Sequence, residues 1–493
     1  MKIKLIYPAQ QFMAGEVPRP DGSLGLLYIA GALRREGFDV SLMDLCVGEA
    51  GDRLADSFFR RTLLDDTHLR IGLPVEVLQS RVQGCDVVAV TSIFTSNTPL
   101  ALEVAAAVKQ MDPSILTVAG GGNARALHRL FLDGGFDVVV CGEGEAVMVE
   151  VCRNHAARRG LEGVHGLAFK NRNGMVVRTP EAPVEPDLDR LPLPAWDLLP
   201  RTRYWEIGDP PGGSFDAASD VRYLTMQTSR GCPFRCSYCH ISREGEGAKL
   251  RLKSDERVLR EFAVLRDLGA NHVFFQDDSL FADRERIVRL LPKIRGYGMC
   301  LADTNGVNVR HFFLGGGSRL ALDEELLDVI HDCGMSDMAI AFESGSRRIL
   351  NRYASRKWNP EKHNPVALVR GAAQRGLRTI GFFTIGYPDE TLDELTETFL
   401  LAKRLVDEGL GSAAFYVVTP YPGTALYDFA IENGFLPPDL DFANMKFQIP
   451  TMVNTTVSPE ILRYTRRLAY QLIHPAHLVA AKDAKTAAAR ARQ

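Results

Sequence analysis

Short apolar runs alternate with amphipathic stretches along the first 155 residues. The runs KIKLIYP, DVSLMDL, VVAVTSI, LTVAGGG and DVVVCGE have the length of strands and contain β-branched side chains. Between them, Leu24 to Glu36 and Ala101 to Lys109 repeat apolar positions at helical spacing. This alternation predicts a doubly wound parallel sheet, which binds ligands outside the carboxyl ends of its strands. The residues just after VVAVTSI, LTVAGGG and DVVVCGE should therefore line one crevice.

The pattern changes between residues 156 and 222. The segment GLAFKNRNGMVV indicates a hairpin with Asn173 and Gly174 in its turn. The following LPLPAWDLLP is too rich in proline for a helix or a central strand, so we expect it to run extended and to pack by Leu193 and Trp196. We interpret residues 156–222 as a connector between the first domain, residues 1–155, and a second domain.

A second series of strand and helix signals begins at Tyr223. The runs YLTMQTS, HVFFQDD, LADTNGVN, MAIAFES, TIGFFTIG and AAFYVVTP are each followed by a helix-like stretch. Six such β/α units predict a partial (β/α)6 TIM-like barrel over residues 223–428. Residues 429–493 are expected to form a helical C-terminal segment, with one helix from Pro459 to His474 and a frayed helical tail. The predicted fold class is α/β throughout.

Size, composition and charge narrow the classes of function. The 493 residues exceed what one hydrophobic core usually supports, so two large domains are expected. The 46% hydrophobic and 24% charged residues are typical of globular proteins, and no run approaches the ~18 apolar residues of a membrane span. A net charge of −3, with basic residues dispersed outside the tail Lys482 to Arg492, argues against nucleic acid and favours a small-molecule substrate. Nine cysteines without a disulfide pattern or a secretory signal favour the reducing cytoplasm.

Three cysteines stand close together in the loop expected after the first barrel strand. Cys232, Cys236 and Cys239 lie in the segment CPFRCSYCH, a spacing expected by chance roughly 0.003 times in this chain. Three thiolates can hold a 4Fe-4S cluster and leave one iron open to chelate the amino and carboxylate groups of a ligand. Zinc is the chemical alternative because His240 follows Cys239, but ligation by adjacent residues is awkward and no second CxxC is present.

The CxxxCxxC motif after the first strand of a β/α barrel resembles the radical S-adenosylmethionine (SAM) superfamily. The resemblance covers about residues 223–428 and includes DDSLF, FESGS, IGYPDET and TPYPGTALYD at later strand ends. It implies that SAM binds the open iron and is cleaved to a 5′-deoxyadenosyl radical, which abstracts a substrate hydrogen. It also implies that Tyr238 lies beside the adenine. Four strand-end residues would hold the rest of SAM: Asp278, Asn308, Glu343 and Ser344.

Helix capping is the alternative role for some of these strand-end residues. Ser344 or Ser346 could cap the helix expected near Arg347, and Asp389 the helix expected near Leu392. Both roles stay open on the sequence alone.

The first domain resembles the cobalamin-binding domain found ahead of the barrel in one large branch of that superfamily. The matching segments are SLGLLYIAGALRREGFDV, SIFTSN, AGGGNA and GEGE. A nucleotide or a flavin could use the same crevice, although AGGGN is not the GxGxxG fingerprint of dinucleotide binding. The resemblance implies three groups of contacts: Ser92, Phe94 and Thr95 on the corrin side, Gly120, Gly121, Gly122 and Asn123 along the nucleotide tail, and Gly142, Glu143, Gly144 and Glu145 at the rim.

One departure from that resemblance concerns the lower ligand of cobalt. Other cobalamin domains carry DxHxxG, whose histidine ligates the metal from below. The comparable stretch from Asp44 to Glu49 reads DLCVGE and has no histidine. We therefore expect cobalamin to bind without that ligand, with Cys46 as an alternative donor.

The resemblance implies a methyltransferase that acts on an unactivated carbon, in which the substrate radical takes a methyl group from methylcobalamin. A cyclase, a ring-rearranging enzyme or an oxidative enzyme resembles the fold equally well, and a non-catalytic cobalamin or redox sensor is the alternative from another class. A small-molecule substrate and an electron donor such as a flavodoxin or ferredoxin are the expected partners. Two long connections, residues 311–320 and 351–364, are expected to recognise the substrate, with an ordinary surface loop as the alternative.

Overall fold

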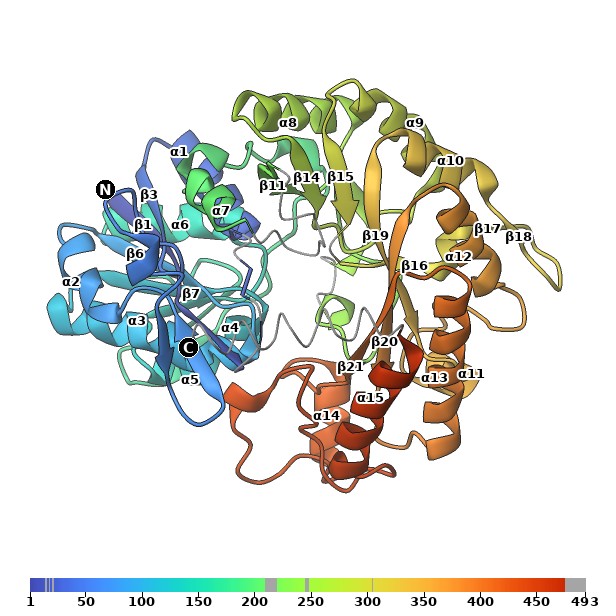
Figure 1. Ribbon diagram of the computed structural model, residues 1–493. Coiled ribbons are helices and arrows are strands. Elements are labelled where there is room, and N and C mark those ends of the chain that lie inside the picture. Colours follow the sequence, from blue (N-terminus) through green and yellow to red (C-terminus); the bar gives the residue numbers. More distant parts are fainter. Residues whose placement is uncertain are drawn as a thin grey trace. The chain divides into compact units, whose positions relative to one another are not determined.

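The computed structural model divides the chain into two compact units, each with its own large sheet (Figure 1). Among the described residues, the division falls between Gly208 and Asp220. The structure describes residues 1–13, 16, 18–19, 22–208, 220–243, 248–303 and 305–474.

The first unit is built on a seven-stranded sheet in the order β10-β9-β8-β7-β6-β1-β3. A hairpin of β9 (Leu167–Lys170) and β10 (Val176–Arg178) extends the sheet antiparallel to its neighbour β8. Every residue of the central strand β6 is buried, as its continuous apolar run VVAVT predicts. The five parallel strands are β1 (Lys2–Tyr7), β3 (Asp39–Asp44), β6 (Val87–Thr91), β7 (Leu116–Gly120) and β8 (Val138–Val140).

Helices cover both faces of this sheet. The crossovers from β1 to β3 and from β6 to β7 run in opposite directions along the sheet, so right-handed connections place their helices on opposite faces. These helices are α1 (Leu24–Arg35) and α3 (Thr98–Met111), and α6 (Gly144–Ala156) packs beside α1. The arrangement confirms the predicted α/β fold. The shorter helices are α2 (Leu78–Arg81), α4 (Gly122–Ala126), α5 (His128–Asp133) and α7 (Arg201–Ile207).

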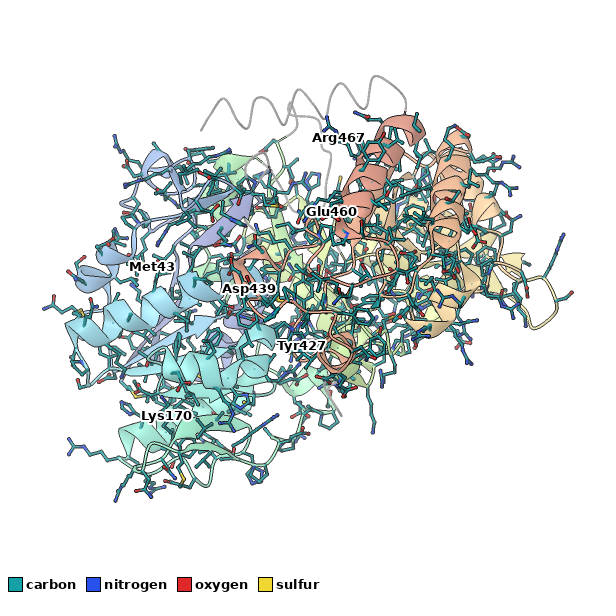
Figure 2. The ribbon with its side chains drawn as sticks, turned by 90° about the horizontal axis from the view of Figure 1, so that it is seen from below. Met43, Lys170, Tyr427, Asp439, Glu460 and Arg467 are labelled. Carbon is teal, nitrogen blue, oxygen red and sulfur yellow. The ribbon has the colours of Figure 1, made fainter. Side chains whose placement is uncertain are left out.

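The hairpin predicted around Asn173 and Gly174 is present, but it belongs to the first sheet rather than to a separate connector. Gly174 has a φ of +75°, which a side chain would strain. Lys170, at the end of β9, pairs with Asp133 at 2.8 Å and joins the hairpin to the end of α5 (Figure 2). Trp196, in the proline-rich segment, is fully buried as predicted.

A small antiparallel sheet in the first unit has no counterpart in our prediction. Its strands are short and half-polar, so their sequence periodicity is weak. They are β2 (Gln10–Met13), β4 (Arg61–Leu63) and β5 (His68–Ile71).

The second unit carries the predicted six parallel strands in chain order, β11-β14-β15-β19-β20-β21. The run LADTNGVN, predicted as one strand, is two: β15 ends at Asp303, and β16 (Val307–Asn308) pairs separately with β19. The six strands are β11 (Tyr223–Met226), β14 (His272–Phe275), β15 (Cys300–Asp303), β19 (Met335–Glu343), β20 (Arg378–Ile385) and β21 (Ser412–Val417). Short ladders pair β12 (Ser229–Arg230) with β13 (Arg251–Leu252) and β17 (Phe313–Leu314) with β18 (Ala321–Leu322).

Helices follow the strands, and polar caps fix where each one starts. Every helix named below has a Ser, Thr, Asp or Asn side chain that accepts a hydrogen bond from a backbone N–H of its first turn. The helices are α8 (Asp255–Asp267), α9 (Arg284–Arg295), α10 (Glu324–Asp332), α11 (Arg347–Arg352), α12 (Pro365–Gln374), α13 (Leu392–Asp407), α14 (Ala425–Glu432) and α15 (Pro459–Ile473), the last of which carries Glu460 and Arg467 (Figure 2).

Two of the predicted caps have different outcomes. Ser346 caps α11, as one alternative had it. Asp389 does not cap α13: Thr391 does, in a capping box with Glu394, because a threonine at that position reaches the third backbone N–H of the helix.

No helix among the described residues is both long and apolar enough to cross a bilayer. The predicted helix near the C-terminus is α15, which ends one residue before the predicted bound His474. The frayed tail that we expect after it lies outside the described residues.

Candidate functional site

The cysteine loop of the second unit, residues 229–243, follows β11. At its start, the N–H of Cys232 donates to the carbonyl of Ala248 at 3.1 Å, and β12 pairs with β13. Gly231 has a φ of +84°, and a Cβ there would lie 2.2 Å from the carbonyl oxygen of Lys249, so only glycine allows this turn. Further along, the N–H of Ser237 donates to the carbonyl of Tyr353 at 2.9 Å. The loop is therefore held by backbone contacts on both sides.

The three thiols of this loop are shielded to different extents. Cys236 is 4% exposed, and burial raises the pKa of its thiol to about 12 against the opposing charge of Lys357. Burial also raises the pKa of Cys239. Because ligating thiols must lose their protons, metal binding here would release protons from groups that otherwise keep them.

No three His, Cys, Asp or Glu side chains of the described chain converge as ligands of a single metal ion. A 4Fe-4S cluster does not require such convergence, since each thiolate binds its own iron.

The strand-end carboxylates after β14 support the cysteine loop. Asp278 accepts a hydrogen bond from the N–H of Gly231 at 2.8 Å. Its neighbour Asp277, 1% exposed, accepts from the N–H and hydroxyl of Thr228 and from the hydroxyl of Ser229. The end of β14 thus fixes the start of the loop, a structural role for Asp278 beside its predicted contact with SAM.

Glu343 is held in an unusual conformation at the end of β19. Its φ is +62°, a strained value for a residue with a side chain, and such strain occurs most often at functional sites. Lys357 donates to one carboxylate oxygen at 2.6 Å and Thr384 to the other at 2.8 Å. Burial alone would raise the pKa of Glu343, but the charge of Lys357 and these hydrogen bonds lower it below its usual value. Glu343 is therefore a buried, fixed negative charge.

Tyr238 of the cysteine loop has a buried hydroxyl without a hydrogen-bond partner among the described residues. Its pKa is well above the ordinary value, first because the hydroxyl is buried and then because of the charge of Glu343. Its ring centre lies 6.1 Å from that of Tyr387 in the loop after β20.

The remaining two predicted SAM contacts differ in the polar atoms that they leave free. The hydroxyl of Ser344 lies 3.0 Å from that of Thr398 in α13 and accepts from the N–H of Ser346, so it joins β19 to α11 and α13. Asn308 accepts from the N–H of Arg310, but its buried side-chain NH₂ group has no partner among the described residues. Asn308 therefore keeps a hydrogen-bond donor for a ligand, while the hydroxyl of Ser344 is already used in hydrogen bonds within the protein.

Two residues beside this site belong to the long connections that we expected to recognise the substrate, but no sequence signal singles them out within these connections. Lys357 lies in the long connection after α11, and only the fold brings it to Glu343. His311, in the other long connection, has its ring centre 5.9 Å from that of Phe234 in the cysteine loop. Burial, and then the charge of Lys357, lower the pKa of His311 to about 4.

In the first unit, the loops after β6 and β7 are joined by a buried polar contact. Asn123 is fully buried and donates to the hydroxyls of Ser92 at 2.8 Å and Thr98 at 2.9 Å. Gly121 has a φ of +98°, and a Cβ there would lie 2.5 Å from the carbonyl oxygen of Ser92. Ser92, Gly121 and Asn123 therefore pack against one another, and these contacts do not require a bound ligand.

Two large apolar side chains are exposed directly after β6. Ile93 and Phe94, directly after β6, are 48% and 52% exposed, which is unusual for side chains of this size. Thr95 is 2% exposed behind them, and a Cβ at Gly122 would meet no atom within 4 Å. A flat apolar ligand would find two large side chains and bare backbone here.

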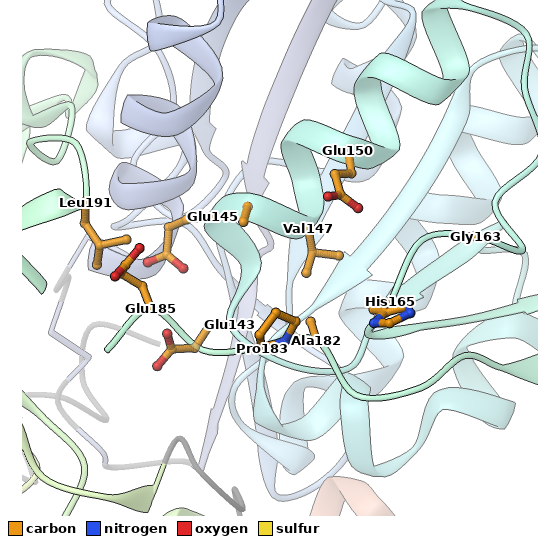
Figure 3. Close-up of a pocket in the computed structure, with 11 residues that line it drawn as sticks. Glu143, Glu145, Val147, Glu150, Gly163, His165, Ala182, Pro183, Glu185 and Leu191 are labelled. Carbon is orange, nitrogen blue, oxygen red and sulfur yellow. The ribbon is translucent and has the colours of Figure 1, made fainter. Parts of the chain in front are cut away.

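Two of the predicted rim residues after β8 line a cavity of the first unit. Glu143 and Glu145 line a cavity of about 290 Å³ together with Glu150, Glu185 and His165 (Figure 3). Gly142 has open space around it, and a Cβ at Gly144 would press on Ile29.

Cys46, the alternative cobalt donor expected from the sequence, lies two residues after the end of β3. It is 5% exposed, its N–H donates to Asp44 at 2.7 Å, and its thiol donates to the carbonyl of Pro8 at 3.5 Å. Tyr204 of α7 donates to the other oxygen of Asp44. The thiol is directed into the protein's own backbone.

Comparison with known families matches the two units in turn. The family described as B12 binding domain matches residues 13–152, and the Radical SAM superfamily matches residues 226–402.

Curated relatives align over most of the chain. Cytidylyl-2-hydroxyethylphosphonate methyltransferase of Streptomyces wedmorensis is 27% identical over 91% of this chain and 85% of its own length. An uncharacterized methyltransferase of Pyrococcus horikoshii is 30% identical over 88% and 84%. The anaerobic magnesium-protoporphyrin IX monomethyl ester cyclase of Rubrivivax gelatinosus is 24% identical over 92% and 73%.

Solved structures share the fold. The radical SAM methyltransferase TsrM from Kitasatospora setae, with cobalamin and a [4Fe-4S] cluster bound, aligns over 89% of this chain and 80% of its own with a TM-score of 0.65 and 17% identity. The cobalamin-dependent SAM radical enzyme OxsB aligns over 95% and 65% with a TM-score of 0.69 and 15% identity. The chain therefore belongs to the cobalamin-binding branch of the radical SAM superfamily, enzymes that work with a 4Fe-4S cluster, SAM and cobalamin.

Proposed function

We propose that this enzyme methylates an unactivated carbon of a small-molecule biosynthetic intermediate. The succession of a B12-binding domain and a radical SAM domain in one chain carries the proposal. The two methyltransferase relatives, which align over at least 84% of their own lengths, support it.

The described residues of the cysteine loop fit an iron-sulfur cluster. Cys232, Cys236 and Cys239 would each bind one iron and leave the fourth for SAM. When bound, the cluster supplies the electron that breaks a carbon-sulfur bond of SAM, and cobalamin carries the methyl group. The burial of Cys236 limits water access on one side, and Asp278 and Ala248 keep the loop in place.

Three side chains would bind the organic part of SAM. Asn308 offers a buried NH₂ group without a partner among the described residues, and Glu343 offers a carboxylate that Lys357 and Thr384 hold in one orientation. Tyr238 would lie against the adenine. Asp278 could contact SAM only while it also holds Gly231, and Ser344 would act mainly through packing.

In the first unit, we propose that the corrin ring lies on the exposed Ile93 and Phe94, with Ser92 and Thr95 behind them. The bare backbone at Gly122 would admit the nucleotide tail. The absence of histidine between Asp44 and Glu49, with the thiol of Cys46 turned to Pro8, supports binding without a lower protein ligand.

Anaerobic reconstitution with iron, sulfide and cobalamin tests this function. We expect reduced enzyme to release 5′-deoxyadenosine from SAM and, with substrate, S-adenosylhomocysteine alongside it. Replacing Cys236 with Ala should abolish iron binding and SAM cleavage but leave cobalamin binding intact. Cys300→Ala, at an exposed cysteine outside the loop, is the matched control and should retain all three. Zinc in place of iron, or full turnover by the Cys236 variant, would overturn the assignment.

The same assay separates the rival functions. A cyclase or rearrangement enzyme, which the cyclase relative favours, would release 5′-deoxyadenosine without S-adenosylhomocysteine. A sensor would release neither. The electron donor would be a flavodoxin or ferredoxin, and the cytoplasm would keep the oxygen-sensitive cluster and the nine free cysteines reduced.

A further inference from the structure

A cavity of the second unit lies among α12, α13 and the two long connections. Its volume is about 430 Å³. It is lined by residues 319–320, Gly345, Trp358, residues 360–366, and Leu401 and Arg404 of α13. Gly345 directly follows the predicted SAM contact Ser344, so the cavity reaches the end of β19, but none of its lining residues belongs to the cysteine loop.

Positive charge gathers at this cavity without a compensating carboxylate. Arg319, Lys362 and Arg404 line it, and their side chains make no hydrogen bond or ion pair to any described residue. Glu361 is the one acidic residue among the described lining, and its carboxylate pairs with Arg347 at 2.5 Å.

Other arginines on the surrounding helices form ion pairs, whereas Arg404 does not pair with any described residue. Arg370 of α12 pairs with Glu408, Arg375 pairs with Asp328, and Arg348 of α11 pairs with Glu394. Arg404 lies on α13 among these pairs and has no such partner in the described part of the chain. Three cations around one hollow, unpaired within that part, favour an anionic ligand.

His363 contributes a buried donor to the same wall. The residue is 7% exposed, and burial, as the largest cause, lowers its pKa, so its ring is neutral at neutral pH. The carbonyl of Asn359 already accepts from the N–H groups of Lys362 and His363, while the N–H of Asn359 donates to Nδ1 of His363 at 3.1 Å. Nδ1 also lies 3.0 Å from that carbonyl, which already has two N–H donors, so the N–H of Asn359 assigns the ring proton to Nε2, which has no hydrogen-bond partner among the described residues. A buried N–H donor without an acceptor costs stability that a ligand oxygen would recover.

The other residues that line the cavity indicate which further chemical groups the ligand carries. The N-terminus of α12, at Asn364 and Pro365, adds the positive end of a helix dipole. Trp358 and Leu401 provide apolar surface. We propose that this cavity is a second binding site, for the phosphoryl group of a small organic molecule whose apolar part packs on Trp358.

The proposal does not depend on methyl transfer, because none of its residues belongs to the cysteine loop. The phosphoryl group could belong to a substrate or to a separate effector. If it belongs to a substrate, replacing Arg404 should raise KM and leave the binding of SAM unchanged. If it belongs to an effector, the same change should remove only the effect of added phosphoryl compound on rate.

Calorimetric titration of the full chain with inorganic phosphate, phenyl phosphate and the neutral benzyl alcohol tests the site. We expect saturable binding of phenyl phosphate, tighter than that of phosphate, and none of benzyl alcohol. Arg404→Gln and Arg319→Gln should each weaken phenyl phosphate at least about tenfold, since each removes a charge-assisted hydrogen bond. Arg370→Gln, at a paired arginine of α12, is the matched control and should bind like the parent.

Two results would overturn the proposal. One is the absence of saturable phenyl phosphate binding to a folded protein. The other is equal binding by the Arg404, Arg319 and Arg370 variants, which would indicate an unspecific attraction to basic surface rather than this cavity.

Discussion

Replacing Gly121 with alanine tests whether the loops after β6 and β7 depend on a bare backbone. Gly121 has φ and ψ of +98° and 165°, a region that only glycine adopts readily, and occupying it costs a side-chain residue about 1–3 kcal/mol. The new Cβ would also lie 2.5 Å from the backbone oxygen of Ser92, closer than real contacts allow. Relief of such overpacking costs about 1–3 kcal/mol more. We expect a total loss of about 2–6 kcal/mol, a large share of the stability of a typical domain.

Gly122 provides the matched control one residue further along. A Cβ added there would have no atom within 4 Å, and Gly122 is the first residue of α4. Alanine there should leave the free energy of unfolding unchanged or raise it by up to about 1 kcal/mol. Urea unfolding of the cofactor-free chain, followed by circular dichroism, measures both variants.

The two variants should also differ in cobalamin binding. Gly121→Ala should weaken it because the loop after β6 must move, whereas Gly122→Ala should weaken it without loss of stability if the tail approaches that backbone. A Gly121 variant that unfolds at the same urea concentration as its parent would refute the steric reasoning.

Two further perturbations probe buried charges of the second unit. Glu390 is 1% exposed, and burial raises its pKa from 4.5 to about 8. The folded state therefore holds a proton that the unfolded state releases, so this stability is fully present below pH 4.5 and is lost as pH rises through about 8. Glu390→Gln should flatten the fall in unfolding free energy between about pH 4.5 and pH 8, and an unchanged pH profile would contradict the shift. Lys357→Met should lower the free energy of unfolding by about 3–5 kcal/mol because it leaves Glu343 buried without its partner. Adding Glu343→Gln should recover most of that loss in a double-mutant cycle. Additive losses would show that the two residues are not coupled.

Local sequence signals explain most of what could be predicted of the fold. Each of the six barrel strands produced an apolar run with a polar end, and the cysteine loop is a motif within eight consecutive positions. The hairpin at Asn173 and Gly174 also rests on neighbours in sequence. The attachment of that hairpin to β8 could not be predicted in the same way, because strand pairing depends on which edge is vacant.

Contacts between distant segments explain what the sequence did not reveal. Lys357 lies 14 positions after Glu343, in the irregular segment beyond α11, where no periodicity identifies an inward side chain. The basic cavity combines residues near 319, 362 and 404, each of which resembles an ordinary solvated charge in sequence. Their common surroundings exist only in the folded unit.

Ser344 and Asn308 show why residue type alone does not assign a role at a strand end. Both are polar, both are at most 5% exposed, and both follow or end strands on the side where a barrel places its chemistry. The difference lies in their hydrogen bonds: the hydroxyl of Ser344 is committed to Thr398 and the N–H of Ser346, while Asn308 uses its oxygen locally and keeps a buried NH₂ group without a partner among the described residues. Burying a donor without an acceptor is costly, so such a group persists where a ligand supplies the acceptor. The unmet donor, rather than the polar residue itself, is therefore the feature that separates a candidate ligand contact from a packing contact.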